Sequence, residues 1–90
     1  MSIQQQLMEL FWEVLEGCDY DVDTIKSELQ VDDDPTKKYM IDSLDMVEYY
    51  IRIQEHFGIV IPQDDYMKLD TIGHIEDDVS DKLVPPATAG

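Results

Sequence analysis

Apolar residues recur at intervals of three and four along three stretches of the chain, and this spacing restricts the possible folds more than any other feature of the sequence. Side chains at that spacing share one face of an α-helix, which must be buried against another element. In the first stretch these residues are Ile3, Leu7, Leu10, Phe11, Val14 and Leu15. Ser2 and Gln5 form a capping-box pattern before them, so we predict a helix that begins after Ser2 and ends at Gly17.

A second helix is predicted to begin at Asp42 or Ser43 and to end at about Phe57, where Gly58 fits a C-terminal cap. Its apolar positions form two adjacent stripes, which are Met46, Tyr50, Ile53 and Phe57, and then Leu44, Val47 and Ile51. That arc is wider than contact with one neighbouring element requires. A last helix is predicted to end before Pro85. Its apolar positions are Ile72, Ile75, Val79 and Leu83.

The segments between these helices are predicted to be a long loop and a short connection. Helical spacing weakens over residues 18–41, although Val22, Ile25 and Leu29 fit one short helical turn. The run from Asp32 to Pro35 interrupts any longer helix. Residues 59–62 read as an extended connection, and residues 64–69 suggest a short third helix. The predicted fold is an all-α, four-helix bundle in one domain over residues 1–84, with a mobile tail over 85–90.

Charge and composition exclude several classes of partner. The chain has 21 acidic residues and 6 Lys plus Arg, for a net charge of -15. Binding to nucleic acid or to anionic membranes relies on clustered Lys and Arg, so we expect neither partner, and we expect basic protein surfaces instead. No apolar segment is long enough to span a bilayer and no export signal is recognisable. Cys18 is the only cysteine, so no internal disulfide is possible, and a reducing cytoplasmic setting is the simpler interpretation. We also expect a monomer.

The segment IDSLDMVE, residues 41–48, sets Ser43 between two aspartates at the predicted start of the second helix. Unpaired N–H groups and the helix dipole favour a phosphate at such a position, which suits a serine that bears a phosphodiester. The simpler interpretation is that Asp42 or Ser43 caps the helix, a contribution of about 1 kcal/mol. No catalytic base lies nearby to activate Ser43 as a nucleophile. This segment alone leaves both interpretations open.

The longer stretch DSLDMVEYYIRIQEHFGIVIP, residues 42–62, resembles the signature of acyl carrier proteins. In that family an Asp-Ser-Leu opens the second helix, acidic residues follow, and a Phe and an Ile-Pro lead to a short third helix. The matching residues here are Asp42-Ser43-Leu44, Asp45 and Glu48, Phe57, and Ile61-Pro62. The resemblance covers nearly the whole chain and implies an acyl-carrier-type bundle.

The resemblance implies that Ser43 is the attachment point of a phosphopantetheine arm, added from coenzyme A by a phosphopantetheinyl transferase, with Asp42 assisting that enzyme and its magnesium ion. The carrier, itself no enzyme, would hold acyl groups as thioesters on the arm and not on Cys18. Part of the apolar arc would line a bundle interior that shelters the cargo. The protein would deliver its cargo to enzymes of fatty acid, polyketide or related biosynthesis. The residues implied to contact partner enzymes are Leu44, Asp45, Met46, Glu48, Ile51 and Glu55.

Two departures from the family pattern bear on the cargo. The family usually has a glycine close before the Asp-Ser pair, where this chain has Met40-Ile41. Tyr49 and Tyr50 replace aliphatic residues, and their rings would narrow an acyl cavity, so a short, polar or unusual cargo is as consistent as a fatty acid. A D-alanyl or other aminoacyl carrier stays an alternative, as does an unmodified acidic module that binds a basic protein. The aspartates at 32–34 lack the spacing of a calcium loop, so we expect no metal site.

Overall fold

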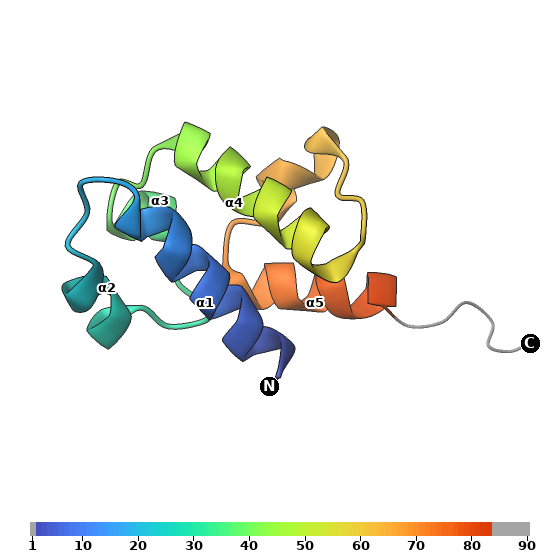
Figure 1. Cartoon of the computed structure of the whole chain (residues 1–90), viewed down its shortest axis with the longest axis horizontal. Coiled ribbons are helices and arrows are strands. Elements are labelled where there is room, and N and C mark those ends of the chain that lie inside the picture. Colours follow the sequence, from blue (N-terminus) through green and yellow to red (C-terminus); the bar gives the residue numbers. More distant parts are fainter. Residues whose placement is uncertain (1, 84–90) are drawn as a thin grey trace, which may run out of the picture.

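The computed structural model describes residues 2–83, and every regular element in that range is helical (Figure 1). The three long helices are α1 (Ile3–Glu16), α4 (Ser43–Phe57) and α5 (Ile72–Leu83). Helix α1 packs against both α4 and α5, and also contacts α2 (Val22–Glu28). The predicted all-α bundle is confirmed, whereas the predicted tail over 85–90 lies outside the described residues. None of the helices within residues 2–83 is sufficiently long and apolar to cross a membrane.

The ends of the long helices follow the predicted capping chemistry. The Ser2 hydroxyl accepts a hydrogen bond from the Gln5 N–H at 3.1 Å, and the Gln5 side chain accepts one from the Ser2 N–H at 3.3 Å. At the C-terminal end of α4, Gly58 has a φ of 67°. A residue without a Cβ adopts this left-handed conformation at little cost, so α4 ends where the sequence predicts.

The long loop between α1 and α4 contains two short helices, of which α2 was predicted and α3 (Pro35–Lys38) was not. Asp34 caps α3, because its Oδ1 accepts hydrogen bonds from the N–H groups of Thr36 and Lys37 at 3.0 and 3.3 Å. Pro35 occupies the first helical position, where its missing N–H costs nothing. The Asp-Pro pair that we interpreted as an interruption therefore starts a helix. The short third helix is the 3-10 helix η1 (Gln63–Lys68).

Five aromatic rings form a continuous series through the bundle, which we call the aromatic row. Successive ring centroids lie 5.5, 5.0, 6.1 and 4.5 Å apart. The members, in order, are Trp12, Phe11, Tyr49, Tyr50 and Tyr66. Phe11 and Tyr49 are fully buried and Tyr50 is 4% exposed, so the row fills the space between α1, α4 and η1.

The two central tyrosines of the aromatic row are anchored through their hydroxyl groups. Tyr49 donates a hydrogen bond to the carbonyl of Leu7 on α1 at 2.7 Å, and Tyr50 donates one to the carbonyl of Leu69 at 2.7 Å. A buried hydroxyl without a partner is costly, and these bonds satisfy both groups. Burial also raises the pKa of both tyrosines, that of Tyr50 to about 12. Adjacent residues of α4 are thus fixed to two different parts of the bundle.

Candidate functional site

Ser43 is the first residue of α4, and it is not the residue that caps this helix. The Asp42 side chain accepts the hydrogen bond from the Leu44 N–H at 2.9 Å, which makes Asp42 the N-cap. Ser43 is exposed, and within residues 2–83 its hydroxyl has no hydrogen-bond partner. Of the two capping residues that the sequence left open, the structure selects Asp42. The Ser43 hydroxyl is therefore available for modification without loss of the cap.

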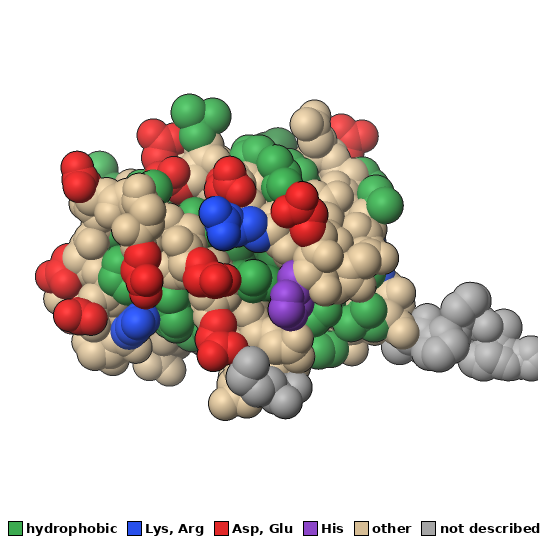
Figure 2. Space-filling model, in the orientation of Figure 1, with side chains coloured by type: hydrophobic (Ala, Val, Ile, Leu, Met, Phe, Trp, Pro, Cys, Tyr) green, Lys and Arg blue, Asp and Glu red, His purple; other side chains and the backbone are tan. Residues whose placement is uncertain are grey.

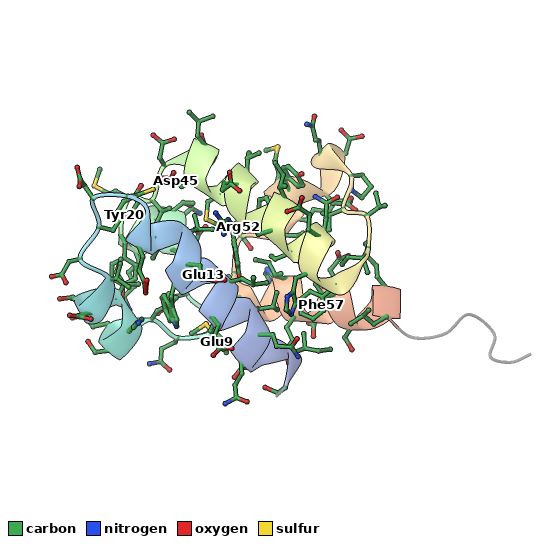
Figure 3. The ribbon with its side chains drawn as sticks, in the orientation of Figure 1. Glu9, Glu13, Tyr20, Asp45, Arg52 and Phe57 are labelled. Carbon is green, nitrogen blue, oxygen red and sulfur yellow. The ribbon has the colours of Figure 1, made fainter. Side chains whose placement is uncertain are left out.

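A hydrogen-bond cluster from the long loop holds the start of α4 (Figure 3). The Tyr20 hydroxyl donates to one carboxylate oxygen of Asp45 at 2.7 Å and accepts from the backbone N–H of Asp42 at 3.0 Å. The Cys18 thiol lies 3.3 Å from the other oxygen of Asp45. Tyr20 thus holds α4 on both sides of Ser43, through the backbone of Asp42 and the side chain of Asp45. Nothing in the sequence alone indicated this cluster, because Tyr20 and Asp45 are 25 residues apart.

The same cluster changes the chemistry of the single thiol. The hydrogen bond to Asp45, with partial burial and the negative charges around it, raises the pKa of Cys18. A raised pKa keeps the sulfur protonated at neutral pH, and the thiol is a much weaker nucleophile than the thiolate. Cys18 is therefore a weak nucleophile at neutral pH.

Met40, two residues before Asp42, has a φ of 55°. Few residues other than glycine adopt this left-handed conformation, and for a long side chain it is strained. The side chain itself is 84% exposed and so avoids crowding the bundle. The chain therefore makes a left-handed turn just before Asp42 without a glycine.

A groove of about 390 Å³ adjoins Ser43 and runs between α4 and η1. Its apolar lining comes from these two helices, and the α3 segment and the loop before α5 contribute four polar lining residues. The apolar and aromatic lining residues are Met46, Val47, Tyr50, Tyr66 and Met67, and the polar ones are Asp34, Thr36, Lys37 and Asp70. Figure 2 shows hydrophobic side chains gathered over the start of α4 and along its edge toward η1. An apolar surface of this kind therefore lies directly beside the serine.

The residues predicted to contact partner enzymes occupy two different environments. Glu48 and Glu55 are exposed, as are the apolar side chains of Leu44 (76%) and Ile51 (42%). Glu48 pairs with Arg52 one turn later, at 3.2 Å. These four predicted residues together form the outer face of α4.

The other two predicted contact residues point elsewhere. Asp45 is partly buried and bonded to Tyr20 and Cys18, and Met46 is 4% exposed and lines the groove. Their contact with partners stays a prediction, but the structure does not bring them onto the outer face. Within residues 2–83 no group of three His, Cys, Asp or Glu side chains is arranged to hold a metal ion.

A second, larger groove of about 570 Å³ lies along α1 and shares no lining residue with the first. Its lining includes Trp12, His56 and the exposed acids Glu9, Glu13 and Glu16. Figure 3 places Glu9 and Glu13 along α1, away from the start of α4. No residue of the hydrogen-bond cluster lines this groove, so it is not part of the Ser43 site.

Comparison with known protein families agrees with this geometry. A family model described as a phosphopantetheine attachment site matches residues 21–79, a range that begins at the cap of α2 and ends within α5. The match includes Ser43, the N-cap that leaves its hydroxyl free, and the groove beside it. The chain thus belongs to the family of phosphopantetheine attachment domains, carrier proteins whose prosthetic group is covalently bound phosphopantetheine.

Proposed function

We propose that Ser43 bears the phosphopantetheine arm and that this protein is an acyl carrier. The observation that supports this most is the exposed, unpartnered Ser43 hydroxyl at the start of α4, with the capping role assigned to Asp42. A phosphodiester at this position is favoured by the free N–H groups and positive dipole end of the helix. When bound, the arm supplies a thiol that holds the cargo as a thioester. The protein's own residues present the arm and do no chemistry on the cargo.

Partner enzymes are proposed to meet the outer face of α4, formed by Leu44, Glu48, Ile51 and Glu55. Glu48 and Glu55 lie along this face beside the exposed apolar side chains of Leu44 and Ile51, an arrangement expected to meet a basic partner surface with an apolar centre. These partners would be a phosphopantetheinyl transferase, with Asp42 assisting its metal, and the enzymes that load and process cargo. We propose a cytoplasmic role in fatty acid, polyketide or related biosynthesis.

The attachment is tested by Ser43→Ala with a broad-specificity phosphopantetheinyl transferase and coenzyme A. The variant is expected to fold with an unchanged circular dichroism spectrum, because Asp42 still caps α4. The wild-type protein should gain the mass of one phosphopantetheine, and the variant should gain none. Ser27→Ala, at an exposed serine of α2, is the matched control and should be loaded normally. A modified Ser43→Ala protein, or an unmodified wild type, would refute the proposal.

A further inference from the structure

A thioester-bound acyl chain could lie in the groove between α4 and η1, or it could insert between the core side chains of the bundle interior. Burial strongly favours whichever place is open, since each buried methylene shifts the equilibrium roughly fourfold. The length of chain that can be buried therefore decides which acyl groups the carrier protects. The packing of the aromatic row determines whether an acyl chain can enter the bundle interior or stays in the groove.

The aromatic row closes the bundle interior behind the groove. Tyr50 lines the groove, and behind it Tyr49 and Phe11 follow at ring distances of 6.1 and 5.0 Å, both with no exposed surface. An alkyl chain that enters the interior at Tyr50 displaces this ring from its 2.7 Å bond to the Leu69 carbonyl. That movement would leave a buried hydroxyl and a buried carbonyl without partners. The hydroxyl bond of Tyr49 to Leu7 holds the next ring in the same way.

The groove itself offers a limited apolar surface. Its α4 side is well covered, because Met46 and Tyr50 are 4% exposed, but on the η1 side Met67 is 90% exposed, so the groove is open to water there. Its polar lining includes two carboxylates, each held by its own contacts. Asp34 caps α3, and an Asp70 oxygen lies 2.7 Å from the His74 ring. An alkyl chain that lies in the groove therefore stays in contact with water along the η1 side, and additional methylenes gain little burial there.

We propose that the cargo rests in this groove and is a short acyl group, and that the bundle interior does not take up a long alkyl chain. The inference depends on the proposed attachment of the arm to Ser43. Tyr50 is the residue that sets the limit, because it forms both the wall of the groove and the entrance to the row. It is a specificity-determining residue and takes no part in the chemistry of the thioester.

The test loads the wild-type protein from hexanoyl-coenzyme A and from hexadecanoyl-coenzyme A with a broad-specificity transferase. The rate at which hydroxylamine cleaves each thioester is then followed by intact mass, at low micromolar protein. We expect the two rates to differ by less than about fivefold, because burial of even two additional methylenes would slow cleavage about sixteenfold. In amide spectra, hexanoyl loading should shift Val47, Tyr66 and Met67, and neither cargo should shift Leu7 or Ile53.

Tyr50→Leu should open the interior by removing the ring and its anchor. In this variant hexadecanoyl cleavage is expected to be at least about tenfold slower than hexanoyl cleavage. Tyr39→Leu removes a half-buried ring outside the aromatic row and should behave as the wild type. If Tyr50→Leu does not fold, the wild-type measurements still decide the matter.

Two results would overturn the inference. The first is a wild-type hexadecanoyl thioester that is protected more than about fivefold, with shifts at Leu7 and Ile53. The second is a folded Tyr50→Leu protein with no gain in protection, which would show that Tyr50 is not the barrier. Failure of the proposed function is distinct from both, because the protein would then gain no mass from either coenzyme A derivative.

Discussion

Tyr20 and Asp45 are joined by a 2.7 Å hydrogen bond between the phenol and the carboxylate, and the same phenol accepts the Asp42 N–H at 3.0 Å. One side chain of the long loop thereby fixes the residue before Ser43 and the residue two positions after it. The start of α4 is consequently held by tertiary contacts in addition to its cap. Ordering of the attachment site is thus linked to ordering of the loop.

The variant Tyr20→Phe keeps the ring but removes both of these hydrogen bonds. A hydrogen bond to a charged group contributes about 1.5 to 3 kcal/mol, and partial exposure reduces that, so we expect a loss of about 1 to 2 kcal/mol in the free energy of unfolding. Urea denaturation measures this loss, and phosphopantetheine transfer to Ser43 should be slower. Tyr39→Phe is the control, because its hydroxyl lies 3.4 Å from exposed Glu28. Equal stabilities for the two variants would contradict the role of Tyr20.

Charge reversal on the outer face of α4 should slow encounter with partners and leave the fold intact. Glu48→Lys breaks the exposed pair with Arg52, a contribution of about 0.3 to 0.5 kcal/mol. Electrostatic steering changes association rates by about tenfold to a thousandfold and weakens with salt. The second-order rate of arm transfer at low salt should therefore fall. Asp81→Lys, the same charge change on α5, should keep the wild-type rate, and equal slowing in both variants would mean that only net charge matters.

Self-repulsion among the acidic side chains should limit stability at low salt. The net charge is -15, and Glu9 and Glu13 are exposed acids one turn apart on α1. The melting temperature should rise as salt is added. Most of the rise should occur by about 0.1 M salt, where charges more than roughly 10 Å apart are screened from one another. Glu9→Gln with Glu13→Gln should raise the low-salt melting temperature and flatten its salt dependence. A melting temperature that falls on adding salt would oppose this account.

Alkaline pH should unfold the protein partly through the aromatic row. Burial raises the pKa of Tyr50 from its ordinary value of 10.0 to about 12. The unfolded state then loses this proton first, so the stabilisation is complete below pH 10 and is lost as pH rises from 10 toward 12. Tyr50→Phe has no such proton, and its melting temperature should fall less steeply over that range. Tyrosinate absorbance follows the ionisation in both proteins. Identical pH slopes of the melting temperature for the wild type and Tyr50→Phe would mean that a group other than Tyr50 accounts for the alkaline loss of stability.

Local signals in the sequence predicted the long helices, and tertiary contacts account for what it could not predict. The caps at Ser2 and Gly58 depend on neighbouring residues, so both were visible. Helix α3 spans four residues, too few to display a period, although an aspartate followed by proline is a valid helix start. The groove combines side chains from three separate segments, and their meeting depends on the whole fold.

Met46 shows how two lines of sequence reasoning can differ. The resemblance implied contact with partner enzymes, whereas the apolar stripe grouped Met46 with Tyr50 and Ile53, which predicts burial. The structure agrees with the stripe, because all three side chains are at most 4% exposed. The periodicity thus reports which face of α4 is inside, and only Leu44 and Ile51 among the apolar candidates remain on the outside.

The aromatic row also gives the protein an internal optical reporter. Trp12 is the single tryptophan and stands at one end of a series whose tyrosines follow within a few ångströms of one another. Resonance energy transfer from excited tyrosine to indole decreases steeply with separation, so light absorbed by Tyr49 and Tyr50 should emerge as Trp12 fluorescence. The ratio of indole emission excited through tyrosine to that excited directly should therefore follow the packing of the core in real time, without any added label.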